Sequence, residues 1–258
     1  MTENWRDFYI GNRPKIRALL SVIGGFAIWE ILARTVLTNR LVIVPFSTVL
    51  DTLWALARTG ELWKNVYVSL TEFVLGFLLA AVIGIFLGFL TGTSTRAREY
   101  LEPLVSALYA TPLVALIPFY IIVFGIHLAS KLALVFTIAV FPIMISTQAG
   151  ILSVERNLLE VASSFRATSV QIFFKVQIPA SIPYIISGLR LGVGRALTGV
   201  VVGELFFATA GLGFMISIAA QTFDTAKVLL GVFIFSVAGV LAVGLLQTIE
   251  RRMAPWRL

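Results

Sequence analysis

A run of residues without a single charged side chain, from Phe73 to Thr95, is the feature that most restricts how this chain can fold. At about 1.5 Å per residue, a helix of this length crosses a hydrocarbon layer about 30 Å thick. The remaining sequence agrees with a membrane location, because 59% of the 258 residues are hydrophobic and 13% are charged. That charged share is about half of what a soluble domain carries. We therefore expect an all-α polytopic membrane protein.

Five further apolar segments bring the expected number of transmembrane helices to about six. The predicted spans are Ala18–Val36, Tyr67–Gly92, Leu101–Gly125, Leu132–Ile151, Pro183–Phe207 and Val228–Ile249. Proline removes a backbone donor and tends to kink a helix, so kinks are expected at Pro112 and Pro118 in the third span and at Pro142 in the fourth. Glycine or alanine recurs every fourth residue from Gly76 to Gly92. This ridge favours close packing inside the bundle over a seam between two copies of the chain.

The distribution of lysine and arginine predicts the orientation of the spans. If the chain starts in the cytoplasm, twelve basic residues lie on the cytoplasmic side and six on the other, with Arg190 and Arg195 inside span five. Because an excess of basic residues marks the cytoplasmic side, both termini are expected there. Residues 1–17 would then form a cytoplasmic interfacial segment, and residues 18–258 would form the transmembrane domain.

The cytoplasmic connection between spans four and five, at about 152–182, is expected to form two short helices. Apolar side chains recur with helical spacing at Leu158, Val161, Ala162 and Phe165. This pattern predicts a short amphipathic helix. Thr168 and Gln171 match a capping box and predict a second short helix, ended by Pro179. Periodicity alone fits a surface helix without a partner as well as a hairpin held by a soluble partner.

The sequence of this hairpin also resembles a known motif. Glu160-Val161-Ala162, Phe165-Arg166-Ala167-Thr168 and Ile178-Pro179 resemble the EAA loop of ATP-binding-cassette (ABC) importer permeases. The segments Gly188–Gly192, Gly194–Ala196, Gly203–Leu205 and Ala210–Gly213 are similar to the branch of that family that imports nitrate, taurine and alkanesulfonates. The resemblance extends upstream to about Val44.

The resemblance implies a permease subunit of an ATP-driven importer for a small anionic or sulfonate-like solute. Its implied partners are cytoplasmic ABC ATPase subunits, a second and identical permease chain, a periplasmic or extracellular solute-binding protein and the lipid bilayer of a bacterial cytoplasmic (inner) membrane. The implied ATPase-coupling residues are Leu158, Glu160, Val161, Ala162, Phe165, Arg166, Ala167, Thr168, Ile178 and Pro179. The chain lacks a G-x-x-x-x-G-K-[ST] phosphate loop, so ATPase activity is expected on a separate subunit, and neither catalytic residues nor a cofactor are expected here.

Arg166 departs from the resembling motif, in which this position is usually glycine. If the turn needs a positive φ, a residue with a side chain costs about 1 kcal/mol or more. Two interpretations follow. Either the turn differs locally, or Arg166 adds a cytoplasmic charge that contacts the ATPase or lipid headgroups.

Three ionisable residues in or near span five are candidates for the substrate pathway: Arg190, Arg195 and Glu204. Charged groups inside a membrane usually face a protein interior or a wet cavity. Helical geometry keeps these three from pairing with one another, so partners are expected elsewhere, at Glu30 or Glu72. Arg195 either attracts an anionic substrate or forms a salt bridge or headgroup anchor. Glu30 and Arg34 are four residues apart and are expected to form an ion pair.

Other classes of function fit the sequence less well. Without cysteine and with His127 as the only histidine, the chain is not expected to build a thiolate or multi-histidine metal site. Basic residues are scattered rather than clustered, which argues against nucleic acid. A self-sufficient secondary transporter or channel is the alternative, but it would leave the hairpin unexplained.

Overall fold

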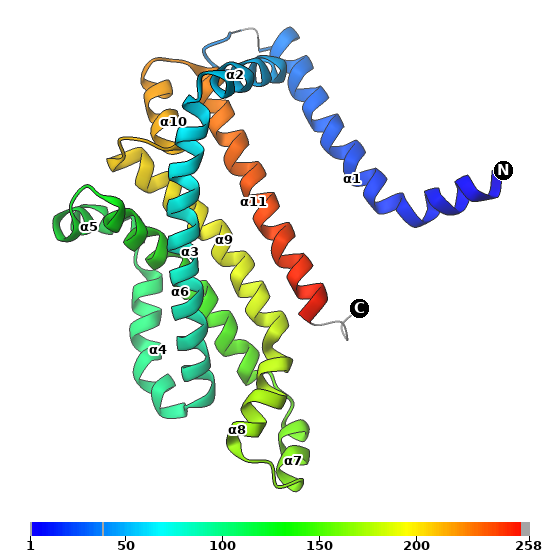
Figure 1. Cartoon of the computed structure of the whole chain (residues 1–258), viewed down its shortest axis with the longest axis vertical. Helices are drawn as coiled ribbons and strands as arrows, with labels where there is room; N and C mark the ends of the chain where they lie inside the picture. Colours follow the sequence, from blue (N-terminus) through cyan, green and yellow to red (C-terminus); the bar gives the residue numbers. More distant parts are fainter. Residues whose placement is uncertain (1, 38, 254–258) are drawn as a thin grey trace. The chain divides into compact units, whose positions relative to one another are not determined.

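The computed structural model describes residues 2–37 and 39–253, and it describes side chains at 16–37 and 39–252. Every element in this described part is a helix (Figure 1). The elements in chain order are α1 (Thr2–Thr35), α2 (Phe46–Thr59), α3 (Glu61–Thr93), α4 (Thr95–Ala110), η1 (Leu113–Leu116), α5 (Ile117–Phe124), α6 (Leu128–Leu152), α7 (Arg156–Ser164), α8 (Ser169–Ile172), η2 (Phe173–Gln177), α9 (Ile178–Phe207), α10 (Leu212–Gln221) and α11 (Thr225–Met253). The expected all-α class is confirmed.

Five helical segments are long and apolar enough to cross a membrane, and a bent pair supplies a sixth. They are Ile16–Thr35, Glu61–Thr93, Leu128–Leu152, Ser169–Phe207 and Thr225–Arg252, with the pair Thr95–Ala110 and Leu113–Phe124. The expected number of about six spans is therefore confirmed. Residues 2–17 of the expected interfacial segment belong to α1, and the side chains of residues 1–15 lie outside the described part.

The kink expected at Pro112 in the third span is a sharp break between two helices. α4 ends at Ala110, and the axis turns by 88° before η1 and α5 continue. Thr111 is extended, as expected for a residue before proline, and Pro112 has no N–H to continue the helical hydrogen bonds. Pro118 lies in the first turn of α5 and Pro142 lies inside the continuous helix α6. The break of this span is therefore located at Pro112.

The chain divides into two compact units, and the first contains residues 1–62 and 216–232. Its helix α2 was not predicted. The Glu30 carboxylate accepts hydrogen bonds from the Ser47 backbone N–H at 3.0 Å and the Ser47 hydroxyl at 2.8 Å, which places an anion at the positively polarised N-terminus of α2. The predicted Glu30–Arg34 ion pair is confirmed at 2.6 Å.

The second unit contains residues 63–215 and 233–258, with α6 packed between the glycine ridge of α3 and one face of α9. The ridge packs inside the unit, as predicted, and the helix that it faces is α6. A Cβ atom on Gly76 would lie 2.6 Å from the Val135 Cγ1, and one on Gly92 would lie 2.7 Å from the Ile151 Cβ. On the other side, a Cβ on Gly199 of α9 would lie 3.0 Å from the Val135 Cα. Glycine thus permits the close packing of α3 and α9 against α6.

Candidate coupling hairpin and membrane-embedded charges

The predicted amphipathic helix is α7, which projects with α8 beyond the ends of α6 and α9 (Figure 1). The Ser163 and Ser164 hydroxyls donate to backbone carbonyls one turn earlier. Arg156 and Glu160 form an ion pair at 3.3 Å on its surface. Because both partners of this pair are well exposed, it contributes little stability. The polar face of α7 is thus solvated, and Glu160 lies on it.

Arg166 adopts the left-handed conformation, with a φ of 55°. The Arg166 N–H donates to the Ser163 carbonyl at 2.8 Å, and the Ala167 N–H donates to the Ala162 carbonyl at 3.1 Å. These two bonds define a Schellman motif, the helix C-terminus that usually carries glycine at the position of Arg166. The turn therefore does not differ locally from the glycine type. The Arg166 side chain is exposed.

We predict that Arg166→Gly keeps the hairpin folded and stabilises it by about 1 kcal/mol, because glycine has no Cβ to disfavour a positive φ. Thermal unfolding of the purified assembly and recovery of its ATPase subunits measure the effect. Arg166→Val is the matched comparison, since a β-branched residue is strongly disfavoured in this conformation. Loss of ATPase assembly in Arg166→Gly would refute the alignment of the hairpin with the EAA motif.

The second short helix, α8, begins with the predicted capping box. The Thr168 hydroxyl accepts from the Gln171 N–H at 3.3 Å, and the Gln171 side chain accepts from the Thr168 N–H at 2.9 Å. The prediction that Pro179 ends this helix is wrong. The π-turn η2 links α8 to α9, and Pro179 lies in the first turn of α9, where the missing N–H of proline is tolerated.

Span five therefore begins at Ile178 rather than at Pro183, and Ser169–Phe207 forms one helical path of 39 residues. The Ile178 N–H donates to the Phe173 carbonyl across the wide turn. Single π-turns of this kind accommodate a disturbance of the helical hydrogen bonds without ending the helix. The hairpin is thus continuous with span five through its backbone.

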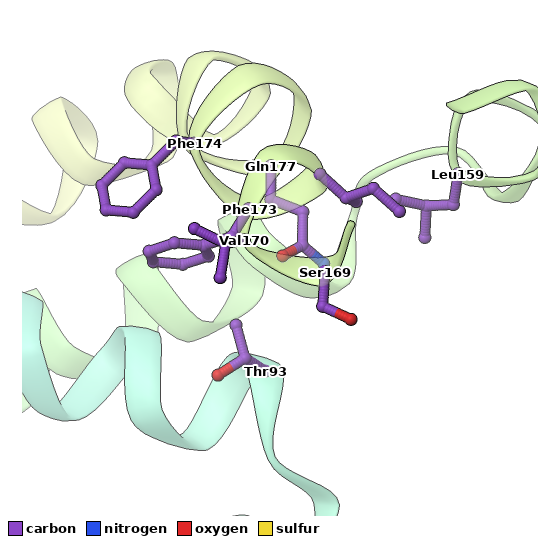
Figure 2. Close-up of a pocket in the computed structure, with 8 residues that line it drawn as sticks. Thr93, Leu159, Ser169, Val170, Phe173, Phe174 and Gln177 are labelled. Atoms are coloured by element: carbon purple, nitrogen blue, oxygen red, sulfur yellow. The ribbon is translucent and has the colours of Figure 1, made fainter. Parts of the chain in front are cut away.

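Large apolar side chains are exposed along the hairpin. They are Leu158, Val161, Phe165, Val170 and Phe174, and the Phe165 side chain is 84% exposed. Beside them a cavity of about 500 Å³ opens between α7, α8, η2 and the end of α3. Figure 2 shows Thr93 of α3 facing Val170 and Phe173, with Leu159 of α7 at the side. Grouped apolar exposure next to polar residues is typical of a protein-binding surface.

Two of the three charged candidates in α9 have partners within the chain. Arg190 forms an ion pair with Glu250 of α11. Glu204 is 1% exposed and accepts hydrogen bonds from the Ser69 hydroxyl and the Gly213 N–H, each at 2.6 Å. The expectation that Glu30 or Glu72 would be their partner is wrong. Glu30 caps α2, and Glu72 forms a buried ion pair with Lys131 of α6.

The Glu72–Lys131 pair was not predicted. Lys131 lies in the sequence where a loop charge was expected, next to the start of span four, and no local pattern connects it with a glutamate 59 residues earlier. The sequence did offer one signal of burial, which is that Lys131 is the only basic residue in an otherwise apolar stretch. Burying both partners together avoids the cost of one unpaired charge.

Arg195 differs from the other two candidates, because its side chain is exposed and no ion pair or hydrogen bond joins it to another described residue. It lies about 25 Å along the axis from the start of α9 and about 18 Å from its end, at 1.5 Å per residue. A cation this deep in a span is unfavourable against lipid. This cost favours a wet or protein-lined environment for Arg195 over lipid.

Comparisons with known proteins place the chain in a family. Residues 80–255 match the family described as binding-protein-dependent transport system inner membrane component, and the chain belongs to this family. The Bacillus subtilis protein SsuC, named for the transport of aliphatic sulfonates, is 36% identical over 90% of this chain and 84% of its own length. The taurine transport system permease protein TauC of Escherichia coli is 31% identical over 94% of this chain and 92% of its own length.

Solved ABC transporters share the fold. An amino acid ABC transporter with histidines has a TM-score of 0.63 at 18% identity, covering 78% of this chain and 97% of that chain. A methionine ABC transporter in inward-facing conformations has a TM-score of 0.58 at 21% identity, covering 72% and 96%. The chain is thus the multi-pass inner-membrane permease subunit of an ABC importer, which works with separate ATPase subunits and a binding protein.

Proposed function

We propose that this permease conducts a small anionic, sulfonate-like solute, and that Arg195 lines its path. Two of the relatives are named for taurine and aliphatic sulfonates, and the observation that carries the proposal for this chain is the exposed guanidinium of Arg195 in the middle of α9. Guanidinium groups bind oxyanions through paired hydrogen bonds. Arg190 pairs with Glu250, and Glu204 accepts hydrogen bonds from Ser69 and Gly213. These two residues therefore stabilise the position of α9 beside the solute path.

The hairpin between α6 and α9 is the proposed contact with the ATPase. Its coupling surface comprises Leu158, Glu160, Val161, Ala162, Phe165, Arg166, Ala167, Thr168, Ile178 and Pro179. Support comes from the exposed apolar side chains of α7 and from the hydrogen-bonded turn that joins α7 to α8. Ile178 and Pro179 lie where the hairpin enters α9, so force applied to the hairpin is transmitted directly to a transmembrane helix.

The proposed assembly has two identical permease chains, with both termini and the hairpin in the cytoplasm. The excess of basic residues on that side supports this orientation. Residues 1–17 lie at the cytoplasmic interface, and residues 18–258 form the permease domain. In a two-fold pair each chain presents one Arg195, which concentrates positive charge along a shared path.

Uptake into vesicles tests the proposal. We predict that the permease, reconstituted with its ATPase subunits and binding protein, accumulates a labelled short alkanesulfonate only when ATP is supplied. A zwitterionic amino acid and a neutral pyrimidine serve as comparison solutes. Uptake driven by an ion gradient without ATP would instead support a secondary transporter, and transport of the neutral solute alone would refute the anionic substrate.

A further inference from the structure

A buried polar cluster lies at the end of α9 that is far from the hairpin. It comprises Asn65, Ser69 and Glu72 of α3, Lys131 of α6 and Glu204 of α9, all of them buried. Ser69 stands at its centre, because its hydroxyl donates to the Glu204 carboxylate at 2.6 Å and accepts from the Leu212 N–H at 2.8 Å. Both oxygens of Glu204 are engaged, so this carboxylate is not available to a solute.

The cluster binds three successive backbone N–H groups at the start of α10. The Gly211 N–H donates to the Asn65 side-chain oxygen at 3.0 Å, the Leu212 N–H to Ser69 and the Gly213 N–H to Glu204. The first N–H groups of a helix have no partner within the helix. Here side chains from α3 and α9 provide those partners, and the negative carboxylate also suits the helix dipole.

The backbone at Gly211 fits this contact closely. Its φ of 121° lies in a region that favours glycine, and a Cβ added at Gly211 would overlap the Glu204 carboxyl group. A Cβ on Gly213 would lie 2.7 Å from the Glu204 Cβ. The turn before α10 is therefore shaped around Glu204, and the start of α10 is attached to the end of α9 as well as to α3.

We propose that Glu204 is a positioning residue that makes the start of α10 move together with α9. α9 is continuous with the hairpin through the π-turn, as one path from Ser169 to Phe207, and Glu204 lies one turn from its far end. A displacement of the hairpin thus reaches the other side of the membrane through α9 and passes to α10 through the Glu204 carboxylate. This inference rests on the proposed role of the hairpin as the ATPase contact.

Because the chain contains no cysteine, a single Met215→Cys reports on the packing of α10. Met215 lies in the first turn of α10 and is 5% exposed. The label is N-ethylmaleimide, applied to the assembled complex in lipid vesicles. We expect the cysteine to react at least about tenfold faster when Met215→Cys is combined with Glu204→Ala than when Glu204 is kept, because the first turn of α10 can then open locally. ATP hydrolysis and recovery of the ATPase are expected to persist, while solute uptake per ATP falls.

Two companion variants sharpen the test. Glu204→Gln keeps one acceptor oxygen and should restore slow labelling and uptake in part. Glu99→Gln removes an exposed carboxylate of α4 and should leave the labelling of Met215→Cys unchanged. If Glu204→Ala does not assemble, Ser69→Ala must give the faster labelling, because it removes the hydroxyl that joins Glu204 to Leu212.

Unchanged labelling in assembled Glu204→Ala, or in Ser69→Ala where Glu204→Ala fails, overturns the proposed attachment of α10. Faster labelling together with undiminished uptake per ATP overturns the role of Glu204 in transmitting movement. Full retention of the ATPase by a hairpin variant that lacks the exposed Phe165 side chain is a separate result, which would refute the hairpin contact while leaving the labelling experiment interpretable.

Discussion

Phe165→Ala is expected to reduce recovery of the ATPase subunits with the permease by about thirtyfold and to abolish uptake. Phe165 is the most exposed large apolar side chain of the hairpin. It lies at the end of α7, directly before the Schellman turn at Arg166. Aromatic anchors of this kind each contribute about 2 kcal/mol or more to an interface, which is about thirtyfold in affinity. Co-purification and a binding titration of the ATPase measure the loss.

The matched control is Phe86→Ala on α3. Phe86 is also an exposed phenylalanine in the second unit, but it lies within a membrane-spanning helix rather than in the hairpin. Its replacement should leave ATPase recovery unchanged. Equal losses in both variants would indicate a general defect in folding, and retention of the ATPase by Phe165→Ala would exclude Phe165 from the interface.

Arg195→Gln is expected to lower uptake of the anionic solute about tenfold or more, while the complex assembles normally. A hydrogen bond to a charged group contributes about 1.5–3 kcal/mol, and the lower limit of this range corresponds to about a tenfold change in affinity. Arg195 has no ion pair with a described residue, so its removal leaves no unpaired carboxylate in the chain. Initial uptake rates at several solute concentrations separate weaker solute binding from slower transport.

Arg195→Lys keeps the charge and should retain more uptake than Arg195→Gln. Arg190→Gln provides a contrast, because it breaks the ion pair with Glu250 and should lower the stability of the complex. If Arg195→Gln showed normal uptake but a less stable complex, Arg195 would be a structural residue and the anion path would lie elsewhere.

The parts of the fold that the sequence predicts are those governed by neighbouring residues. Apolar runs identify the spans, and the spacing of Leu158, Val161 and Phe165 identifies α7. Thr168 and Gln171 predict their own capping box, because both partners lie within one turn. The ridge of small residues predicts close packing, since glycine or alanine at every fourth residue lets another helix approach closely.

Breaks and continuations of helices were harder to predict. Pro112 and Pro179 look alike in sequence, yet one accompanies a bend of 88° and the other lies in the first turn of a continuous helix. The difference comes from the π-turn before Pro179, which has no sequence signature. α2 did leave a signal that was overlooked, with Pro45 before its first residue and Gly60 after its last.

The partners of the embedded charges could not be predicted from local patterns. Ser69 and Glu204 are 135 residues apart, and Asn65 and Gly211 are 146 apart. Helical geometry excluded pairs within α9, but it could not identify which other helix lies beside each charge. Only the packing of α3 and α9 around α6 brings these residues together.

Cross-linking of the hairpin tests the central claim most directly. Ser163 is exposed on α7, and Ser163→Cys introduces the only cysteine of the chain. In the assembled complex, a short cysteine-to-lysine cross-linker should join this cysteine to an ATPase subunit, and the adduct should disappear in Phe165→Ala. A cysteine that reacts with a membrane-impermeant reagent from the outside, or that joins no other polypeptide, would contradict the account.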